Sequence, residues 1–257
     1  MDLSALYGLR LRTDRLELRW PDEQEIAELA HLAETGVHER GEMPFVVPWT
    51  DGIGQPDFLA RFSAFHAELR RDWRVDHWQL DLGVWAADEL IGVQGVVGHE
   101  FAATHEVKTG SWLAQGFHGR GFGTEMRAAV LELAFHGLGA EAALSSALDG
   151  VAASMRVSQK LGYVEDGVSE IEVRGEPRFD TRMRLTRDRW IDRERISVRI
   201  SGLEPCIPLF GLDRPPEPGS RLADVTETGV SVATLNKGAA SHGLSVSVRP
   251  GRYLRDW

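Results

Sequence analysis

The sequence predicts an α/β protein of the α+β type, in which a mixed, mostly antiparallel central sheet is flanked by helices. Segments that alternate apolar and polar residues stand between segments in which apolar residues recur every three or four positions. From residue 8 to residue 190 their order is one strand, two helices, three strands, a helix, a strand, a helix and two strands. Short connections within the strand runs favour antiparallel pairing.

The amino-terminal part of this pattern begins with a strand in RLELRW. Asp22 and Glu25 have the spacing of a capping box, so a helix is expected directly after them. A second helix is predicted from about Asp57, with apolar side chains on one side as far as Trp73. Three strands follow in HWQLDLGVWA, ELIGVQGVVG and EVKTGSWLA, and the first two form a hairpin through ADE.

The second part begins with a glycine-rich loop and a helix in which Met126, Val130 and Leu133 share a face. EAALSSALD then indicates a strand, and AASMRVSQKLG indicates a helix that ends at Gly162. YVEDGVSEIEVRG and PRFDTRMRLT predict a closing pair of strands.

The chain divides into three parts on this pattern. Residues 1–190 form the main domain, and residues 191–212 add an extension with a further strand, RISVRI. Residues 213–257 begin with the Pro-rich linker DRPPEPGS and continue as a weakly ordered or β-rich tail. The edge of the RISVRI strand could pair with a second copy of the chain, which would give a homodimer.

Composition excludes several classes of function. The 257 residues carry a formal net charge of −10, which argues against non-specific nucleic-acid binding and suits a neutral or cationic partner. The single cysteine, Cys206, can form no internal disulfide. The start of the chain lacks the apolar core of a signal peptide, and no apolar run is long enough to span a membrane. The histidines do not fall into metal-ligand spacings. We therefore expect a cytoplasmic protein without a metal site.

The segment HGRGFG points to an anion site. Gly119, Gly121 and Gly123 leave backbone N–H groups unobstructed, and the helix that follows adds unpaired donors and the positive end of its dipole. Such a site most often holds phosphate. No lysine follows Gly123, as a P-loop requires, and the spacing and mid-chain position differ from a dinucleotide fingerprint.

This loop, between a strand and a helix in mid-chain, resembles the pyrophosphate-binding segment of the GNAT N-acyltransferases. TDRLELR, GSWLAQGFHGRGFGTEMRAAVLELAF, AASMRVSQKLGYVEDG and RFDTRMRLTRDRW are similar to the RimJ/RimL-like branch, over about residues 9–190. GVHERGEMPFVVPWT resembles an actinobacterial subgroup that includes a mycobacterial member described as a probable succinyltransferase. The resemblance implies the GNAT fold, with a sheet split between its fourth and fifth strands. It also implies acyl transfer from acetyl-CoA, or succinyl-CoA, to a primary amine by direct attack in a ternary complex.

The resemblance implies a CoA-binding site and indicates which residues of this chain would form it. Leu113 and Ala114 would pair their backbone with the pantetheine arm, and Ser154 matches the serine of the family pattern N-x-x-S. Two residues depart from the family, because His118 replaces its leading Gln or Arg and Val151 replaces the Asn. The loop residues that would hold the pyrophosphate are His118, Gly119, Arg120, Gly121, Phe122, Gly123 and Thr124.

The catalytic residues of the family are also replaced. Its usual tyrosine on the fourth helix corresponds to Ser158, so Ser154 and Ser158 are the candidate proton donors, Ser154 being the better because its family position faces the thioester. The alternative for Ser158 is a helix serine that bonds its own backbone. The family's strand glutamate aligns with Lys108, which leaves Glu100, His105 and Glu106 as candidate bases, acting directly or through water, or else as ordinary surface residues.

The acceptor would be a small-molecule amine, a protein N-terminus or a lysine. Phe45 and Trp49 are expected either to form an apolar wall of its pocket or to pack against the second helix. Ser111 would point into the acceptor cleft or into the core, depending on the strand register. Two other functions stay open. One is an acyl-CoA-binding sensor without turnover, and the other is an antibiotic- or metabolite-modifying N-acetyltransferase.

Overall fold

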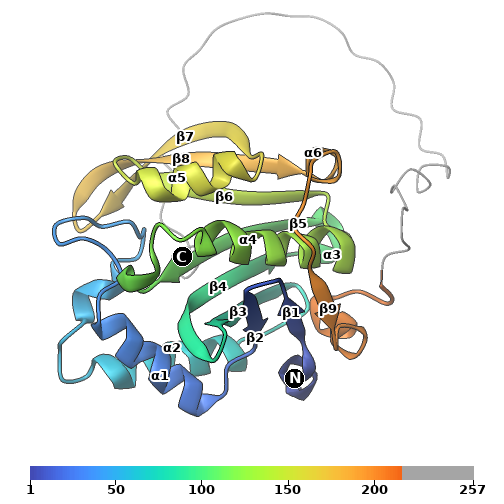
Figure 1. The fold of residues 1–257 in the computed structure, drawn as a ribbon, viewed down its shortest axis with the longest axis horizontal. Helices are drawn as coiled ribbons and strands as arrows, with labels where there is room; N and C mark the ends of the chain where they lie inside the picture. Colours follow the sequence, from blue (N-terminus) through green and yellow to red (C-terminus); the bar gives the residue numbers. More distant parts are fainter. Residues whose placement is uncertain (216–257) are drawn as a thin grey trace, which may run out of the picture.

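The computed structural model describes residues 1–215, and these form a mixed sheet of nine strands with helices on both faces (Figure 1). The strand order is β7-β8-β6-β5-β4-β3-β2-β1-β9. All neighbouring pairs are antiparallel except β5 and β6, which are parallel. The predicted α/β class with a mixed, mostly antiparallel sheet is confirmed.

The sheet begins one strand earlier than the sequence predicts. The expected first strand is β2 (Leu16–Arg19), and β1 (Arg10–Arg12) precedes it after a short 3-10 turn, η1 (Ser4–Gly8). Helix α1 (Glu23–Glu34) then starts with the predicted capping box. The Asp22 carboxylate accepts from the Glu25 N–H at 2.9 Å, and the Glu25 side chain accepts from the Asp22 N–H at 2.9 Å. The two bonds satisfy backbone donors that the first turn leaves unpaired.

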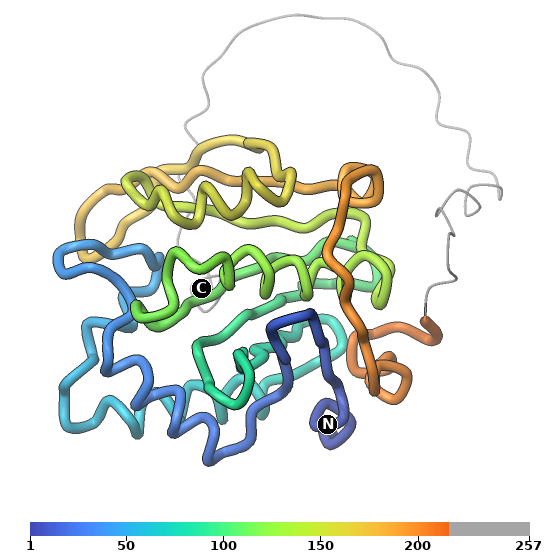
Figure 2. The backbone as a smooth tube through the Cα atoms, viewed as in Figure 1, coloured from blue at the N-terminus to red at the C-terminus, as the bar shows by residue number. Residues whose placement is uncertain are grey.

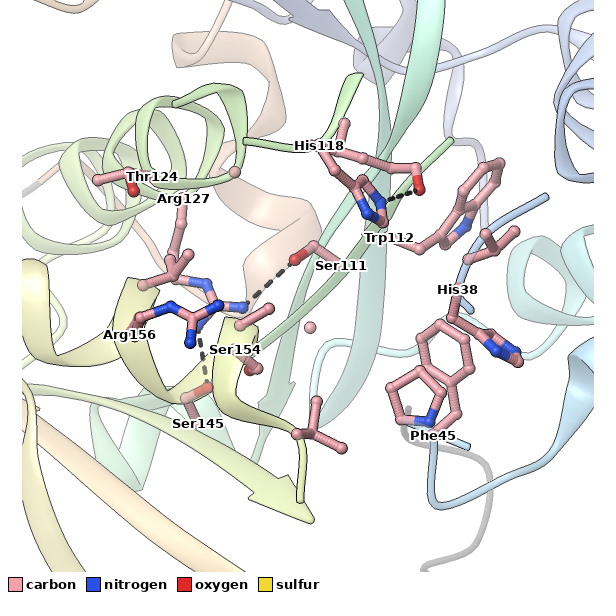
Figure 3. A pocket seen from close by; sticks show the side chains of 18 of the residues that line it. His38, Phe45, Ser111, Trp112, His118, Thr124, Arg127, Ser145, Ser154 and Arg156 are labelled. Atoms are coloured by element: carbon pink, nitrogen blue, oxygen red, sulfur yellow. Dashed lines mark hydrogen bonds between the residues drawn. The ribbon is translucent and has the colours of Figure 1, made fainter. Parts of the chain in front are cut away.

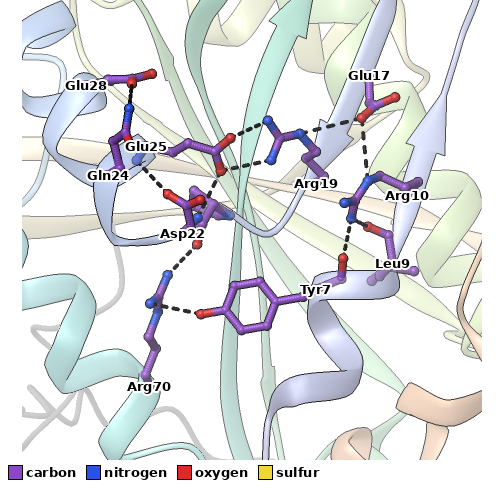
Figure 4. A network of polar contacts seen from close by, with 11 residues as sticks. Tyr7, Leu9, Arg10, Glu17, Arg19, Asp22, Gln24, Glu25, Glu28 and Arg70 are labelled. Atoms are coloured by element: carbon purple, nitrogen blue, oxygen red, sulfur yellow. Dashed lines mark hydrogen bonds and ion pairs between the residues drawn. The ribbon is translucent and has the colours of Figure 1, made fainter.

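Polar contacts fix the entry of the first two helices onto the sheet (Figure 4). Arg19 of β2 forms an ion pair with Glu25 of α1. From α2 (Phe58–Arg71), Arg70 donates to the Pro21 carbonyl and to the Tyr7 hydroxyl. The helix α2 begins at the position that the sequence predicts, after a 3-10 turn, η2 (Trp49–Gly52).

The three central strands are β3 (His77–Ala86), β4 (Glu89–His99) and β5 (Glu106–Leu113). They match the three predicted segments, and β3 and β4 form the predicted hairpin. A short helix that the sequence did not indicate, α3 (Phe101–Thr104), lies between β4 and β5.

The elements after β5 also follow the predicted order. They are η3 (Gln115–Phe117), α4 (Phe122–Glu132) with a π-helical end η4 (Leu133–Gly137), β6 (Ala142–Leu148), α5 (Ala152–Lys160), β7 (Val164–Val173) and β8 (Glu176–Thr186). Gly162 adopts the left-handed conformation after α5, with φ +87°. Helices α4 and α5 lie side by side on one face of the sheet (Figure 1).

The sheet splits between β5 and β6. The two strands pair only over Glu106–Lys108 and Ala142–Leu144, and β5 then continues without β6 beside it. Near the branching point the Thr109 hydroxyl donates to the Leu144 carbonyl at 3.3 Å. The split implied by the family resemblance is therefore present, between these two strands.

The extension adds to the apolar core at the β1 end of the sheet. After α6 (Arg187–Ile191), where the main domain ends, the extension contains β9 (Arg199–Ser201) and η5 (Glu204–Phe210). The predicted RISVRI strand is formed only at its end, because β9 pairs with β1 over three residues. The extension runs back beside the N-terminal segment (Figure 2). There the Phe210 ring contacts Trp73 and Trp78, and the Trp73 indole donates to the Leu209 carbonyl at 2.9 Å. Residues 216–257, most of the predicted linker and tail, lie outside the described residues.

The two largest apolar clusters of the described residues follow from this arrangement, beside a small one of Met43, Leu148 and Val173. The larger joins α4, the extension and one face of the sheet, and the smaller joins α1 and α2 to the other face through Val93 and Trp112. Cys206 is a buried residue of the larger core, where burial raises the pKa of its thiol to about 11. This agrees with a packing role.

Candidate active site

A cavity of about 490 Å³ opens where β5 and β6 separate. The glycine loop, the start of α4 and the helix α5 line it on one face of the sheet. The loop between α1 and α2 lines it on the other, so His38 and Phe45 lie across the cavity from Arg127 and Arg156 (Figure 3).

The strand register assigns the polar side chains of the cavity to these two faces. Ser145 of β6 contacts Arg127 of α4, so it points to the α4/α5 face. Ser146 therefore points to the opposite face, because side chains alternate along a strand. On β8, Asp180 is paired with Leu148, two residues beyond Ser146, and it shares the face of Ser146.

The same alternation applies to β5. Ser111 contacts Arg127 on the α4/α5 face, whereas Trp112 packs into the core of α1 and α2. Lys108 has the parity of Trp112 and lies on the α1/α2 face. The register thus answers the question left open for Ser111, which points toward α4.

The glycine loop has the geometry of an anion site. Gly119 and Gly121 have φ +72° and +84°, and Gly121 is the N-cap of α4. Within residues 1–215, no backbone carbonyl accepts from the five amides of residues 119–123. These donors and the positive end of the helix dipole face the cavity that Gly119, Gly121 and Gly123 line.

The side chains around the loop brace it. The His118 ring contacts the Leu113 carbonyl at 2.9 Å, which assigns the hydrogen to Nε2. Arg15, from the turn before β2, forms an ion pair with Glu125 and donates to the Arg120 carbonyl at 3.1 Å. The loop is therefore held by its own strand and by the N-terminal turn, a role for Arg15 that the sequence did not indicate.

Arg127 is a buried cation in the wall of the cavity (Figure 3). Its guanidinium donates to Ser111 at 3.3 Å, Ser145 at 3.2 Å and Ser158 at 3.0 Å, while its Nε has no hydrogen-bond partner. In the described part of the chain no carboxylate forms an ion pair with it. Burial lowers the pKa of the guanidinium. A buried charge without a counter-ion is costly, so this site favours an anion.

Asp180 is the corresponding carboxyl on the opposite face. It lines the cavity half-buried, and its Oδ1 is buried without a hydrogen-bond partner. Burial raises the pKa of this carboxyl, while Ser146, Lys108 and Arg182 act in the opposite direction.

The loop between α1 and α2 closes the cavity from that face. Phe45 lines it and Trp49 does not. The Trp49 ring packs behind Phe45 against Phe62 and Trp112, so the alternative expectation, packing against the second helix, describes this residue. An ion pair between Asp51 and Arg174 of the β7–β8 turn ties the loop to the other half of the sheet.

Most of the predicted CoA-site residues surround the cavity, and three predicted residues of the loop region and the acceptor wall do not. Ala114 is buried and its N–H bonds the Ile91 carbonyl at 3.0 Å, Arg120 stacks on the Phe117 and Phe122 rings, and Trp49 packs as described. The predicted residues that do line the cavity are Phe45, Ser111, Leu113, His118, Gly119, Gly121, Phe122, Gly123, Thr124 and Ser154.

Three of the four predicted catalytic residues lie outside the cavity. Ser158 is 1% exposed and accepts a hydrogen bond from Arg127, so it supports the guanidinium instead of facing the cavity. Glu106 forms an ion pair with Arg184 at the start of β5, the end away from the glycine loop. Glu100 is exposed at the start of α3. Only Ser154 remains on the cavity wall.

Three further ionisable residues line the cavity without a clear sequence signal, namely His38, Arg127 and Asp180. Arg127 could have been found as a charge within the apolar run of its helix. Asp180 gives no local signal, because it is one of several charged residues in RFDTRMRLT. His38 lines the cavity and contacts the Thr50 hydroxyl at 2.8 Å, but its place depends on how its loop folds back.

Two further properties concern the described residues only. Their side chains include no group of three or more His, Cys, Asp and Glu that could hold a metal ion. None of their helices combines the length and the apolar character needed to cross a membrane.

A sheet split beside a glycine-rich helix start is what the resemblance to the GNAT N-acyltransferases implied. Comparison with known proteins agrees, because residues 15–164 match the family model described as the acetyltransferase (GNAT) domain. The chain belongs to this family, and its fold is the GNAT fold.

Solved structures similar to this chain include RimJ from Mycobacterium smegmatis in complex with CoA-disulfide, with 16% identity and a TM-score of 0.55 over 75% of this chain and 98% of that one. RimL, a ribosomal L7/L12 alpha-N-protein acetyltransferase in complex with coenzyme A, has 14% identity and a TM-score of 0.54 over 68% and 95%. A chimera of the spermidine N-acetyltransferase SpeG from Vibrio cholerae has 17% identity and a TM-score of 0.54 over 70% and 100%. At these identities the likeness shows the fold alone.

Proposed function

We propose that this protein transfers an acyl group from acyl-CoA to a primary amine by direct attack in a ternary complex. One observation carries the proposal. The cavity reaches both faces of the sheet. It is lined by the loop whose amides at residues 119–123 bond no backbone carbonyl, and by the part of β5 that does not pair with β6. One face suits a phosphate-bearing donor and the other a separate acceptor.

The residues of the α4/α5 face fit CoA. The loop amides and the start of α4 would bind its pyrophosphate, as helix N-termini do. Its pantetheine arm carries amides. They can pair with the backbone of β5 beyond Lys108, on the edge that no longer pairs with β6. Arg156 and Lys160 line the same cavity and add positive charge toward the phosphates.

The reaction needs a neutral amine, a donor for the oxyanion and a stabilised leaving thiolate. The amine nitrogen attacks the thioester carbonyl, the N–C bond forms, and the C–S bond breaks as the thiolate leaves. Holding both reactants together already removes a large entropic barrier. Ser154 lines the cavity, which supports it as the residue that would pass a proton to the sulfur.

Arg127 bears on the choice of acyl donor. The acetyl group of acetyl-CoA carries no charge to match a buried guanidinium, whereas a dicarboxylic acyl group such as succinyl carries a carboxylate that could pair with it. The unmatched charge of Arg127 therefore supports succinyl-CoA as an alternative donor to acetyl-CoA.

The acceptor belongs to the class of primary amines. The similar structures include proteins named for spermidine and for a ribosomal-protein N-terminus, and the net charge of −10 suits a cationic acceptor of either kind. A metabolite or antibiotic amine is a third candidate. The acyl-CoA sensor is the alternative function, and absence of turnover would favour it.

Isothermal titration with acetyl-CoA, succinyl-CoA and CoA tests the donor site. We expect micromolar binding of at least one thioester, and a preference for succinyl-CoA if Arg127 binds its carboxylate. Absence of binding by all three ligands would overturn the proposed function.

A further inference from the structure

The α1/α2 face of the split contains a carboxyl group to which the predicted chemistry assigned no role. Asp180 lies on β8 opposite Leu148 and points to the face where Phe45 closes the cavity. Its side chain is separated by the sheet from the glycine loop and from Arg127, which occupy the other face. An acceptor bound beneath Phe45 would therefore lie on the same face of the sheet as Asp180.

Two other carboxylates line the cavity, and their surroundings differ. Glu39 and Glu42 belong to the α1–α2 loop and are exposed, so water competes for both. Asp180 is half-buried, and its Oδ1 is removed from water without a hydrogen-bond partner. Asp180 nevertheless lines the cavity, so a cation bound beside it would offset the cost of burying its charge.

The charges around Asp180 leave it free to take a cation. Within the described residues, no ion pair joins it to Lys108 or Arg182, although both are near enough to favour its charged form. Arg182 is bonded elsewhere, to the Asp166 carbonyl and to Ser169. The remaining charged or titratable groups that line the cavity are His38, Glu39, Glu42, His118, Arg127, Arg156 and Lys160.

Resting on the acyl transfer proposed above, we infer that Asp180 binds the ammonium group of the acceptor amine and accepts one proton from it. The neutral nitrogen then attacks the thioester carbonyl from the α1/α2 face. The N–C bond forms, the C–S bond breaks, the second nitrogen proton goes to the thiolate, and Asp180 returns its proton to water. Burial raises the pKa of Asp180 and so makes it a better base than a solvated aspartate.

The test compares Asp180→Asn with the wild type on two amines of similar shape and different basicity, propylamine and trifluoroethylamine. Propylamine must lose a proton at neutral pH, whereas trifluoroethylamine is already largely neutral. General bases contribute about 10²–10⁴-fold, so we expect kcat/KM for propylamine, and for any basic amine the wild type acylates, to fall about 100-fold or more. Transfer to trifluoroethylamine changes little.

The controls separate this role from a structural one. Glu176→Gln removes an exposed carboxylate from the same strand and should leave both rates unchanged. Asp180→Glu should restore part of the propylamine rate. Because burial opposes ionisation of Asp180 in the folded state, Asp180→Asn should melt no lower than the wild type at neutral pH. In the wild type the rate should fall at low pH as Asp180 becomes protonated, and this fall should be absent in Asp180→Asn.

The contrary results distinguish the role of Asp180 from the acyl transfer on which that role rests. Equal losses for the two amines, or an unchanged propylamine rate, would overturn the role of Asp180 and leave acyl transfer standing. A wild type that binds acyl-CoA but acylates no amine would instead overturn the proposed function.

Discussion

At the scale of single residues, the cavity wall contains one buried and one half-buried ionisable group. Arg127 and Asp180 are paired with no opposite charge among the described residues, and both face the cavity. His66 is the contrasting case, because it lies away from the cavity between the rings of Phe62 and Phe65 on α2. Burial lowers the pKa of His66 to about 3, so its imidazole stays neutral in the folded protein.

This neutral histidine predicts a pH dependence of stability. Below the ordinary pKa of about 6.5 the unfolded chain binds a proton at His66 that the folded chain does not, so stability is lost as the pH falls. The loss from one such group is about 1.4 kcal/mol per pH unit. Denaturant unfolding between pH 6.5 and 4.5 should show a steeper decline for the wild type than for His66→Phe. His31→Gln, an exposed control on α1, should follow the wild type; parallel curves for His66→Phe and the wild type would refute this account.

At the scale of elements, the loop before α4 carries the donor site. Gly121 adopts φ +84° as N-cap, and a Cβ there would approach the Arg15 guanidinium at 3.4 Å. Gly116 lies in the same connection without a positive φ and with nothing within 4 Å of its Cβ position. The two glycines form a matched pair, since only one is needed for backbone conformation.

We therefore predict that Gly121→Val weakens acyl-CoA binding and that Gly116→Val does not. A side chain at positive φ costs about 1–2 kcal/mol, and relief of that strain would move the loop amides, so about a tenfold or larger loss of affinity is expected. Titration calorimetry on both variants measures the effect. Equal affinities would mean that the loop amides do not hold the ligand.

At the scale of the whole molecule, the extension after the sheet belongs to the same core. Phe210 is fully buried against Trp73 and Trp78, although it lies beyond the segment that matches the family model. Truncation of a buried Phe to Ala costs about 3–5 kcal/mol. Phe210→Ala should therefore lower the unfolding free energy by that amount, whereas Phe179→Ala, which removes a ring that is 55% exposed, should change it little. A small effect at Phe210 would mean that the extension is only loosely attached.

The sequence was sufficient for most of the fold because its signals are local. Each of three signals depends on a few neighbouring residues: the capping box of Asp22, the turn that joins β3 to β4, and the glycine after α5. Elements of three or four residues, β1 and α3, carry too little periodicity to be recognised. The glycine loop was found for the same local reason, as a row of small residues at a helix start.

The chemistry of the cavity could not be predicted in the same way. Whether Ser158 or Asp180 faces the cavity depends on contacts between segments far apart in the chain, namely Ser158 with Arg127 and Asp180 with Leu148. No local pattern encodes those contacts. The sequence alone therefore did not indicate which ionisable groups line the cavity.

The most direct test of acyl transfer is thiol release from acetyl-CoA and succinyl-CoA in the presence of spermidine, lysine and a peptide with a free N-terminus, with the product mass measured in parallel. We predict amine-dependent thiol release from at least one thioester and an amine heavier by one acyl group. Thiol release that no amine accelerates, or acyl-CoA binding without any acylated product, would contradict the account.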